Sequence, residues 1–397
     1  MDSHQYKDDL HEYDCLLAVG AKEIFCPAEN ILSSLKQFCN KKKQWLFGHV
    51  SYDVKSETEN VISNKPNRIG FAPAFFFVPE IIIRLAGNKI IVTSFTGQHP
   101  SVVFENIIQS NSSEKNIIYH QPIIKSLYSK AAYLEIINKL KAHILRGDCY
   151  EINFCMEFFA EEASINAAAV YKKLVEISPT PFSCFYKLDD KYLLCASPER
   201  YIKKKGDKII SQPIKGTASR ALSDTKKDAA LKKELYESQK DRSENVMVVD
   251  LVRNDLSRIC KEGTVQVDEL FGMYSFAQVH QMVSTISGIV DEQMNFADVL
   301  AATFPMGSMT GAPKRRVVQL IDKYEETSRG IFSGTVGYIS PENNFDFNVV
   351  IRSIMYNETK KTLSYFAGSG ITFYSDAENE FLECMLKARA MMEALSA

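Results

Sequence analysis

The order of the predicted strands and helices constrains the fold more than any other feature of the sequence. Apolar residues recur at helical spacing after Ser129, a typical N-cap, and Gly147 ends this helix. A strand rich in β-branched and aromatic residues follows directly in CYEINFCMEFF. Further strands are predicted at 183–188, 192–196, 208–212, 332–340, 346–356 and 362–368, and further helices at 166–177, 226–253, 296–303, 313–325 and 377–395. Because strands and helices come in runs and do not alternate strictly, the sequence favours an α+β architecture over a doubly wound sheet.

The first 120 residues are predicted to be mostly strand. The segment RLAGNKIIVTSF has the pattern of a hairpin, with Gly87 and Asn88 between two alternating segments. The polar run QSNSSEKN at 109–116 is the best candidate for a linker or an exposed loop. The most apolar stretch, FAPAFFFVPEIIIRLAG, is interrupted by prolines and charges, so it cannot form the roughly 20-residue apolar helix that a bilayer needs.

Charge and cysteine usage exclude several classes of protein. The 397 residues carry a formal net charge of −2 and no long basic run, which argues against a nucleic-acid or anionic-membrane partner. The amino terminus has no basic region followed by an apolar one, so no export signal is expected. Nine cysteines without a C-x-x-C pair indicate reduced thiols and not a disulfide framework or a zinc site. We therefore expect a cytoplasmic protein.

Two predicted helices each present a pair of acidic residues. Asp241 and Glu244 are three residues apart on one helix, and Glu380 and Glu383 share a stripe with Lys387 on the other. Any single pair taken alone is best interpreted as solvated charge on an amphipathic helix. Alternatively, the two pairs face one another across a hard divalent cation such as Mg²⁺. The spacing leaves both interpretations open.

Three other residues have both a structural and a functional interpretation. Arg352 lies in the apolar run FNVVIRSIMY and needs an anionic partner, either a neighbouring carboxylate or a substrate. His280 in QVHQMVSTI is more often a hydrogen-bonded core histidine than a catalytic one. Lys215 in SQPIKGTASR is either a solvated hairpin residue or an amine placed against a ligand. The glycines beside it allow backbone N–H groups to approach an anion, but they also suit simple turns.

Six motifs in a consistent order resemble the chorismate-utilising enzymes, which include the anthranilate, aminodeoxychorismate, isochorismate and salicylate synthases. They are SPERY, PIKGT, DRSENVMVVDLVRNDLSR, FPMGSMTGAPK, GIFSGTVGY, and AGSGI followed by ENEFLECMLK, and the resemblance covers roughly residues 126 to 395. It implies two large antiparallel β-sheets packed as a sandwich with surrounding helices. It also implies a catalytic domain at 121–397, intertwined into one globule with a short N-terminal subdomain at 1–120. The chemistry implied is magnesium-dependent and acts on chorismate, a ring with two carboxylates.

The resemblance also assigns roles to residues at matching positions. Magnesium would be bound by Glu244 and Glu383, with Asp241 and Glu380 beside them, and would hold the ring carboxylate. The enolpyruvyl carboxylate would be held by Arg352, the backbone of Gly368 and Lys387, while Gly216 and Thr217 would line the pocket at the ring. Glu199 would be the general acid that protonates the departing ring hydroxyl, and His280 would orient that region.

Lys215 indicates which branch of the family the chain resembles. Anthranilate synthases typically have alanine there, whereas PIKGT is typical of the members that form aminodeoxychorismate for p-aminobenzoate and folate synthesis. In those members the lysine amine adds to the ring as the hydroxyl leaves. Ammonia from a separate glutamine amidotransferase subunit then displaces the lysine at the carbon that lost the hydroxyl. The alternatives are an anthranilate-forming enzyme of tryptophan synthesis and a catalytically silent relative that binds only an anion or a partner.

The proton on Lys215 is the chemical difficulty in this hypothesis. A free lysine with a pKa of about 10.4 is neutral about once in a thousand near pH 7. We expect burial, or the positive charges of magnesium, Lys387 and Arg352, to favour the neutral amine, with Glu199 or water taking the proton during the reaction. The isochorismate and salicylate enzymes activate water with a lysine at the position of Glu151, where a carboxylate could still act as a base. The members that form aminodeoxychorismate more often have glutamine there, so Glu151 is a departure from the pattern that the chain otherwise resembles.

Overall fold

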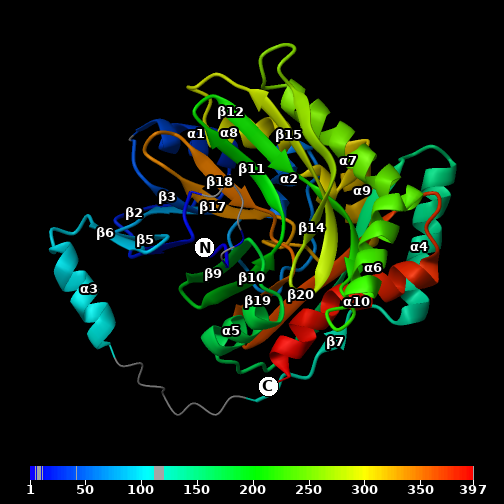
Figure 1. Cartoon of the computed structure of the whole chain (residues 1–397), viewed down its shortest axis with the longest axis horizontal. Helices are drawn as coiled ribbons and strands as arrows, with labels where there is room; N and C mark the ends of the chain where they lie inside the picture. Colours follow the sequence, from blue (N-terminus) through cyan, green and yellow to red (C-terminus); the bar gives the residue numbers. More distant parts are fainter. Residues whose placement is uncertain (5, 7–9, 11, 42, 111–119, 397) are drawn as a thin grey trace.

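The protein is built around two large antiparallel β-sheets. We analysed a computed structural model, which describes residues 1–4, 6, 10, 12–41, 43–110 and 120–396. In this part of the chain the sheets have ten and seven strands, and a three-stranded sheet lies at the amino-terminal side (Figure 1). The predicted α+β sandwich is therefore confirmed.

The ten-stranded sheet combines strands from both ends of the sequence. Its order is β13 (Ile214–Ser219), β15 (Val279–Ile289), β12 (Lys208–Gln212), β11 (Arg200–Lys205), β18 (Phe345–Asn348), β17 (Thr335–Ile339), β3 (Leu46–Val50), β4 (Ala74–Val78) and β2 (Glu23–Phe25), with β14 (Gln266–Ser275) paired to β15. The register places Gly48 of β3 opposite Gly337 of β17. The amino-terminal segment thus completes a sheet that the later sequence begins.

The seven-stranded sheet contains only strands from the later part of the chain. Its order is β16 (Gly311–Ala312), β8 (Glu151–Ala160), β20 (Thr362–Ile371), β19 (Ser353–Asn357), β10 (Lys191–Ser197) and β9 (Phe182–Leu188), with β7 (Lys125–Ser126) paired to β8. The small sheet has the order β1 (Cys15–Val19), β5 (Ile81–Ala86) and β6 (Lys89–Ser94). The last two strands form the predicted hairpin around Gly87 and Asn88.

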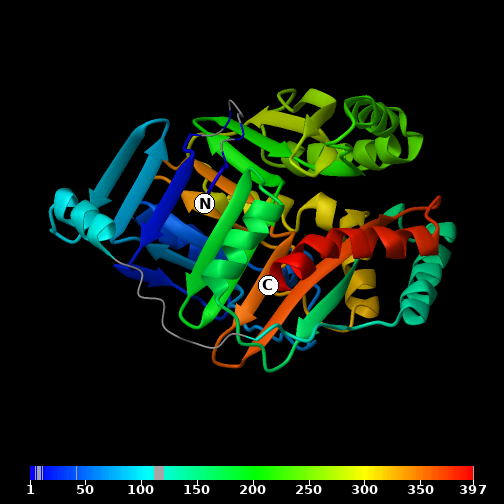
Figure 2. The same ribbon diagram turned by 60° about the horizontal axis from the view of Figure 1, so that its bottom comes forward.

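Helices lie around the sheets, and the third of them along the chain packs on β6 of the small sheet. They are α1 (Ile31–Lys41), α2 (Lys55–Thr58), α3 (Pro100–Gln109), α4 (Lys130–Leu145), α5 (Ala167–Ile177), α6 (Thr225–Glu237), α7 (Gln239–Ser257), α8 (Phe296–Thr303), α9 (Lys314–Tyr324) and α10 (Ala377–Leu395), with 3-10 turns η1 (Tyr52–Val54) and η2 (Gly307–Met309). Figure 2 shows α10, in red, lying across β20. No helix in the described residues is long and apolar enough to cross a membrane.

Most of the predicted elements are confirmed. Ser129 caps α4 as expected, with its hydroxyl accepting a hydrogen bond from the Ala132 amide. The first 120 residues also contain α1, α2 and α3, which were not predicted. The predicted linker at 109–116 lies, beyond Ser110, outside the described residues.

Two predicted elements are wrong because the chain changes direction inside them. The single helix at 226–253 is two helices, separated at Ser238, whose backbone is extended and whose side chain caps α7. The single strand at 346–356 is β18 in the ten-stranded sheet and β19 in the seven-stranded sheet. Between them the chain crosses from one sheet to the other, and Arg352 takes a left-handed backbone conformation with φ 52°.

A second crossover lies beside the first. The segment Pro198–Glu199 connects β10 of the seven-stranded sheet to β11 of the ten-stranded sheet. The Val349 amide donates a hydrogen bond of 3.0 Å to the Glu199 carbonyl, so the two connections are bound to each other. Phe332 stacks on Phe366 of β20 with ring centroids 4.8 Å apart, within one apolar core that contains side chains from both sheets. The crossovers thus place polar side chains beside an apolar core.

Candidate active site

A cavity of about 500 Å³ lies against both large sheets, α7 and α10. This volume is in the range of small-molecule sites. Most of the residues singled out in the sequence line it: Glu199, Lys215, Gly216, Thr217, Asp241, Glu244, Arg352, Gly368, Glu383 and Lys387. Glu380 and His280 are not among the lining residues.

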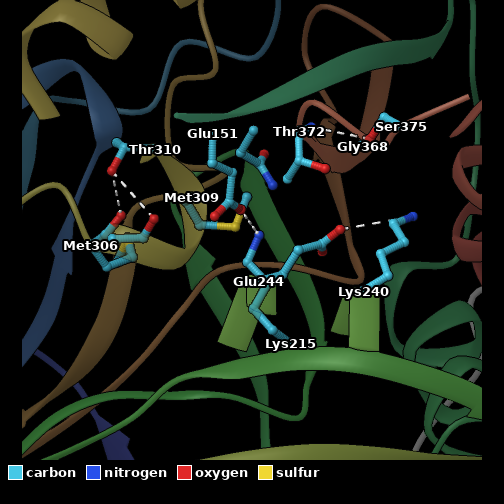
Figure 3. A network of polar contacts seen from close by, with 12 residues as sticks. Glu151, Lys215, Lys240, Glu244, Met306, Met309, Thr310, Gly368, Thr372 and Ser375 are labelled. Carbon is cyan, nitrogen blue, oxygen red and sulfur yellow. Dashed lines mark hydrogen bonds and ion pairs between the residues drawn. The ribbon is translucent and has the colours of Figure 1, made fainter. Parts of the chain in front are cut away.

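Lys215 enters this cavity from β13 and is buried. Its Nζ donates a hydrogen bond to Glu151 Oε1 on β8, so the pair links the ten-stranded sheet to the seven-stranded sheet (Figure 3). The register of β13 against β15 shifts between Ile214 and Thr217, and Gly216 within this irregularity has φ 91°. Lys215 therefore lies in an irregular stretch of β13, and the positive φ that this irregularity requires falls on Gly216, where it causes no strain.

The charges around Lys215 favour its protonated form. Burial alone would lower the pKa of this amine, but the negative charges of Glu151, Glu244 and Glu199 outweigh burial and raise it. The expected effect of burial is thus outweighed in the ligand-free protein, and the ammonium form of Lys215 is favoured. The amine must lose a proton before it can act as a nucleophile.

Glu199 lies at the crossover between β10 and β11 and is 4% exposed. Burial raises the pKa of its carboxyl group from 4.5 to about 7, and the positive charge of Lys215 opposes this rise. Near neutral pH the carboxyl group therefore retains the acid form that a glutamate with the ordinary pKa of 4.5 has lost. A buried acid of this kind can donate a proton to a leaving group.

Arg352 lies at the other crossover and also lines the cavity. Its guanidinium makes no hydrogen bond or ion pair to another side chain or backbone group in the residues that the structure describes. Burial lowers its pKa, and the nearby charge of Glu383 opposes that shift. Of the two partners considered for Arg352, the structure supplies no contacting carboxylate, which leaves the guanidinium available to an anionic ligand.

The remaining cation of the cavity is Lys387 on α10. Its Nζ donates a hydrogen bond of 2.9 Å to the Gly368 carbonyl and lies 2.7 Å from Glu383 Oε1. A Cβ at Gly368 would come within 2.2 Å of the Phe154 carbonyl oxygen and 2.7 Å of Cys155 Sγ, so only glycine fits there. Because Gly368 has no side chain, β20 can pack closely on β8 at the point where Gly368 and Lys387 line the cavity.

Two of the predicted metal ligands, Glu244 of α7 and Glu380 of α10, lie on either side of Lys240. Lys240 Nζ lies 3.8 Å from Glu244 Oε1 and 3.1 Å from Glu380 Oε1 (Figure 3 shows the contact with Glu244). The buried atoms Glu244 Oε1 and Glu380 Oε2 accept no hydrogen bond in the described structure. Burial raises the pKa of Glu244 to about 8, with Lys215 opposing the shift. Asp241 accepts a hydrogen bond from the Ser238 hydroxyl.

These carboxylates fit a hard divalent cation in their chemistry. Buried carboxylate oxygens without a donor are the ligands that Mg²⁺ prefers. Within the described residues, no group of three or more metal-ligating side chains is arranged to hold an ion. Lys240 supplies positive charge to two of the carboxylates and would have to withdraw from them before a metal ion could bind.

His280 differs from the other predicted site residues in its surroundings. Its ring is buried, with Nε2 3.1 Å from Asp228 Oδ1 and Nδ1 2.9 Å from Ser275 Oγ. Asp228 in turn binds Arg220, which lines the cavity. The structure therefore places His280 where it can position Arg220 through Asp228 but cannot touch a ligand in the cavity.

Sequence reasoning missed several residues of the cavity. Lys240, Arg220, Cys155 and Gly370 line it, and Glu151 contacts Lys215 at its edge. Lys240 adjoins Asp241 in DRSEN, and that proximity was the available signal. Glu151 was noted as a departure from the family pattern, but its contact with Lys215 spans 64 residues of sequence and has no local signature.

Comparison with known proteins identifies the family of this chain. The family model described as chorismate binding enzyme matches residues 11–393. The chain belongs to the chorismate-binding enzymes. It is 37% identical over 267 residues to aminodeoxychorismate synthase component 1 of Klebsiella aerogenes, covering 67% of this chain and 58% of that protein. It is 31% identical over 364 residues to anthranilate synthase component 1 of Saccharolobus solfataricus, covering 89% of this chain and 81% of that protein.

Other relatives of this chorismate-binding enzyme extend beyond it. The chloroplastic aminodeoxychorismate synthase of Arabidopsis thaliana is 33% identical over 371 residues, which are 88% of this chain but 40% of that protein. Among solved structures, anthranilate synthase component I from Streptococcus pneumoniae superposes with a TM-score of 0.83 at 24% identity, covering 98% of this chain and 94% of that one. This likeness establishes the shared fold.

Proposed function

We propose that this chorismate-binding enzyme is an aminodeoxychorismate synthase component I. It would aminate chorismate to 4-amino-4-deoxychorismate for p-aminobenzoate and folate synthesis. The observation that carries the proposal is the buried Lys215 amine at the cavity, in the motif PIKGT. The relatives of that name, at 33–37% identity, support it.

Chorismate carries two carboxylates, and each would have a separate cationic partner. Arg352 and Lys387, with the backbone of Gly368, would bind the enolpyruvyl carboxylate. Glu244 and Glu383, with Asp241 and Glu380 beside them, would hold Mg²⁺. The bound ion would supply positive charge to the ring carboxylate. Gly216 and Thr217 would then lie along the ring.

The chemical step would use Lys215 as a nucleophile. Its Nζ forms a bond to the ring, and the C–O bond to the ring hydroxyl breaks. Glu199 donates the proton with which that hydroxyl leaves as water. Ammonia then forms a bond at the carbon that lost the hydroxyl, and the lysine–carbon bond breaks, which releases the product and the lysine amine. His280, acting through Asp228, would position Arg220 in this region.

The source of ammonia would be a separate glutamine amidotransferase subunit, in a heterodimer with this chain. Relatives named component 1 support this, because the name indicates that a second subunit takes part in the reaction. We place the reaction in the cytoplasm, a compartment in which the nine free cysteines would stay reduced.

A second candidate is anthranilate synthase component I. The match to the Saccharolobus protein favours it, because that match covers 81% of the relative, a larger share than in the aminodeoxychorismate synthases. Lys215 favours the first candidate. The two enzymes would differ in their product.

Product analysis tests the proposal directly. The protein is incubated with chorismate, Mg²⁺ and an ammonium salt, with and without added aminodeoxychorismate lyase, and the products are identified by mass spectrometry. We expect p-aminobenzoate only when the lyase is present. Direct formation of anthranilate would replace the proposal by the second candidate, and no binding of Mg²⁺ and chorismate in calorimetry would indicate a silent relative.

Lys215→Ala tests the role of the amine. We expect amination to fall by several orders of magnitude, as it does when a covalent nucleophile is removed from other enzymes. Chorismate binding, measured by calorimetry with Mg²⁺ present, should change little because the carboxylate partners remain. Unchanged production of aminodeoxychorismate would remove Lys215 from the nucleophile role.

A further inference from the structure

Glu151 is the carboxylate in contact with the Lys215 amine. Among the described residues it is the one acidic side chain that forms an ion pair with Lys215, although Glu199 and Glu244 line the cavity and Glu151 lies at its edge. Both members of the pair are buried, Glu151 at 2% exposure and Lys215 at 8%. A proton leaving the amine therefore meets Glu151 before it meets bulk water.

The strands on both sides of β8 fix this contact. Glu151 begins β8, where it pairs with Ala312 of β16. A Cβ at Gly311 would come within 2.1 Å of the Glu151 carbonyl oxygen, so β16 packs tightly on this end of the strand. A Cβ at Gly370 of β20 would lie 2.7 Å from both Glu151 Oε1 and Lys215 Nζ. Glycine at position 370 thus leaves the space in which the carboxylate and the amine meet.

We propose that Glu151 is the base that takes the proton from Lys215 and thereby makes its amine nucleophilic. This inference rests on the proposed function, because it assigns a role within the same amination. It also gives the two proton transfers to two separate carboxyl groups. Glu199 provides a proton to the leaving hydroxyl and need not first receive one from the lysine.

The protons balance through one catalytic cycle. Lys215 begins as an ammonium and gives one proton to Glu151. The neutral amine bonds to the ring while Glu199 protonates the departing hydroxyl, so water leaves and the adduct nitrogen carries the positive charge. Ammonia then displaces the lysine, the positive charge passes to the new amino group, and the released neutral amine recovers its proton from Glu151. Glu199 recovers its proton from solvent, or from the ammonium ion that supplies the ammonia, so each turnover consumes one proton. No oxidant or reductant is involved.

Glu151→Gln separates a base from a simple ion-pair partner, because the two roles predict opposite effects. Glutamine keeps the size and an acceptor oxygen but cannot take a proton. Loss of the negative charge would lower the pKa of Lys215, so a mere ion-pair partner could be removed with no loss of rate or with a gain. Loss of a base should slow adduct formation by about 10²-fold or more at pH 7.

The direct readout is the mass of the Lys215–chorismate adduct, followed by rapid quenching and mass spectrometry without ammonia. In the natural protein we expect that the rate of adduct formation does not rise with pH through deprotonation of Lys215 by solvent, because Glu151 takes that proton. In Glu151→Gln the rate should rise with pH up to about 7, where the acid form of Glu199 begins to be lost, since hydroxide or water must then take the proton from Lys215. Chorismate affinity measured by calorimetry should be retained.

Three further variants complete the experiment. Glu151→Asp keeps a carboxylate and should restore part of the rate. Gly370→Ala keeps both groups but separates them, and it should slow adduct formation as well. Glu157→Gln is the matched control, because Glu157 is equally buried on the same face of β8 but binds Ser364 and Arg68 outside the cavity. It should form the adduct at the natural rate.

The outcomes separate this inference from the proposed function. If the natural protein produces aminodeoxychorismate and Glu151→Gln forms the adduct at the natural rate with an unchanged pH profile, the base assignment alone is wrong. If the natural protein produces no aminodeoxychorismate, the proposed function is wrong and the base assignment falls with it. A Glu151→Gln variant that does not fold leaves Glu151→Asp and Gly370→Ala to decide, and natural rates in both would overturn the assignment.

Discussion

Glu199 illustrates how a single residue obtains its chemistry from its place in the chain. Burial at the crossover raises the pKa of its carboxyl group to about 7, so the acid form needed for proton donation is lost above that pH. We therefore expect the rate of adduct formation to fall as pH rises above about 7. Glu199→Gln should be slower by about 10²-fold or more and should lack this alkaline limb. A natural protein whose rate is constant from pH 6 to 9 would contradict the assignment.

The same shift affects folding. The folded pKa of Glu199 lies above its ordinary value of 4.5, so between about pH 4.5 and 7 the folded protein holds a proton that the unfolded chain has released. The contribution of Glu199 to the free energy of unfolding is therefore largest below this window and declines as pH rises through it.

Short motifs singled out individual residues of the cavity, whose catalytic roles stay predictions. Glu199, Lys215 and Arg352 were assigned from short segments, and all three line one cavity. The protonation of Lys215 was not predicted, because it depends on Glu151, which lies 64 residues away in sequence and on the other sheet. Electrostatics of this kind require the distances between charges, and a sequence does not contain them.

Among the elements, α7 and α10 matter most because each brings carboxylates to the cavity. We expect Glu383→Gln to raise the Mg²⁺ concentration needed for half-maximal activity by about tenfold or more, as loss of a metal-site partner does elsewhere. Calorimetry of Mg²⁺ binding without substrate provides a reading independent of catalysis. Glu378→Gln, in the first turn of the same helix and in an exposed ion pair with Lys130, is the control. An unaltered metal requirement would remove Glu383 from the ligand set.

The errors in element prediction share one physical origin. Both the 226–253 helix and the 346–356 strand are interrupted at points where the chain redirects itself between packed layers. Ser238, three residues before Asp241, carried a readable N-cap signal that the helical periodicity obscured. The turn at Arg352 carried no such signal, because a left-handed arginine is stabilised by its surroundings and not by its neighbours in sequence.

At the scale of the whole molecule, the amino-terminal segment is part of the ten-stranded sheet. β3 pairs with β17, and Phe76 of β4 lies in the same core as Phe347 of β18. We therefore expect a fragment spanning 121–397 to expose this core and the edge of β17, and to fail to fold alone. Near-ultraviolet circular dichroism and thermal unfolding of the fragment would check this. A soluble fragment with a cooperative transition would show that the catalytic part is independent.

The arrangement of the sheets was the part of the fold that residue patterns could least predict. Local periodicity identified most strands, whereas the register of Gly48 against Gly337 joins segments near opposite ends of the sequence. The sandwich itself was predicted only through the family resemblance. Pairing over such separations depends on the collective burial of many side chains, which short windows of sequence do not report.

The two crossovers have a consequence for the search for ligands. Glu199 and Arg352 belong to the connections between the sheets, and both reach the cavity. A dianion bound there would contact residues that connect the two sheets. Its binding should therefore raise the melting temperature and slow proteolysis. At a hundred times its dissociation constant, a ligand adds about 2.7 kcal/mol to the free energy of unfolding. Melting curves could therefore rank candidate substrates before any product is known.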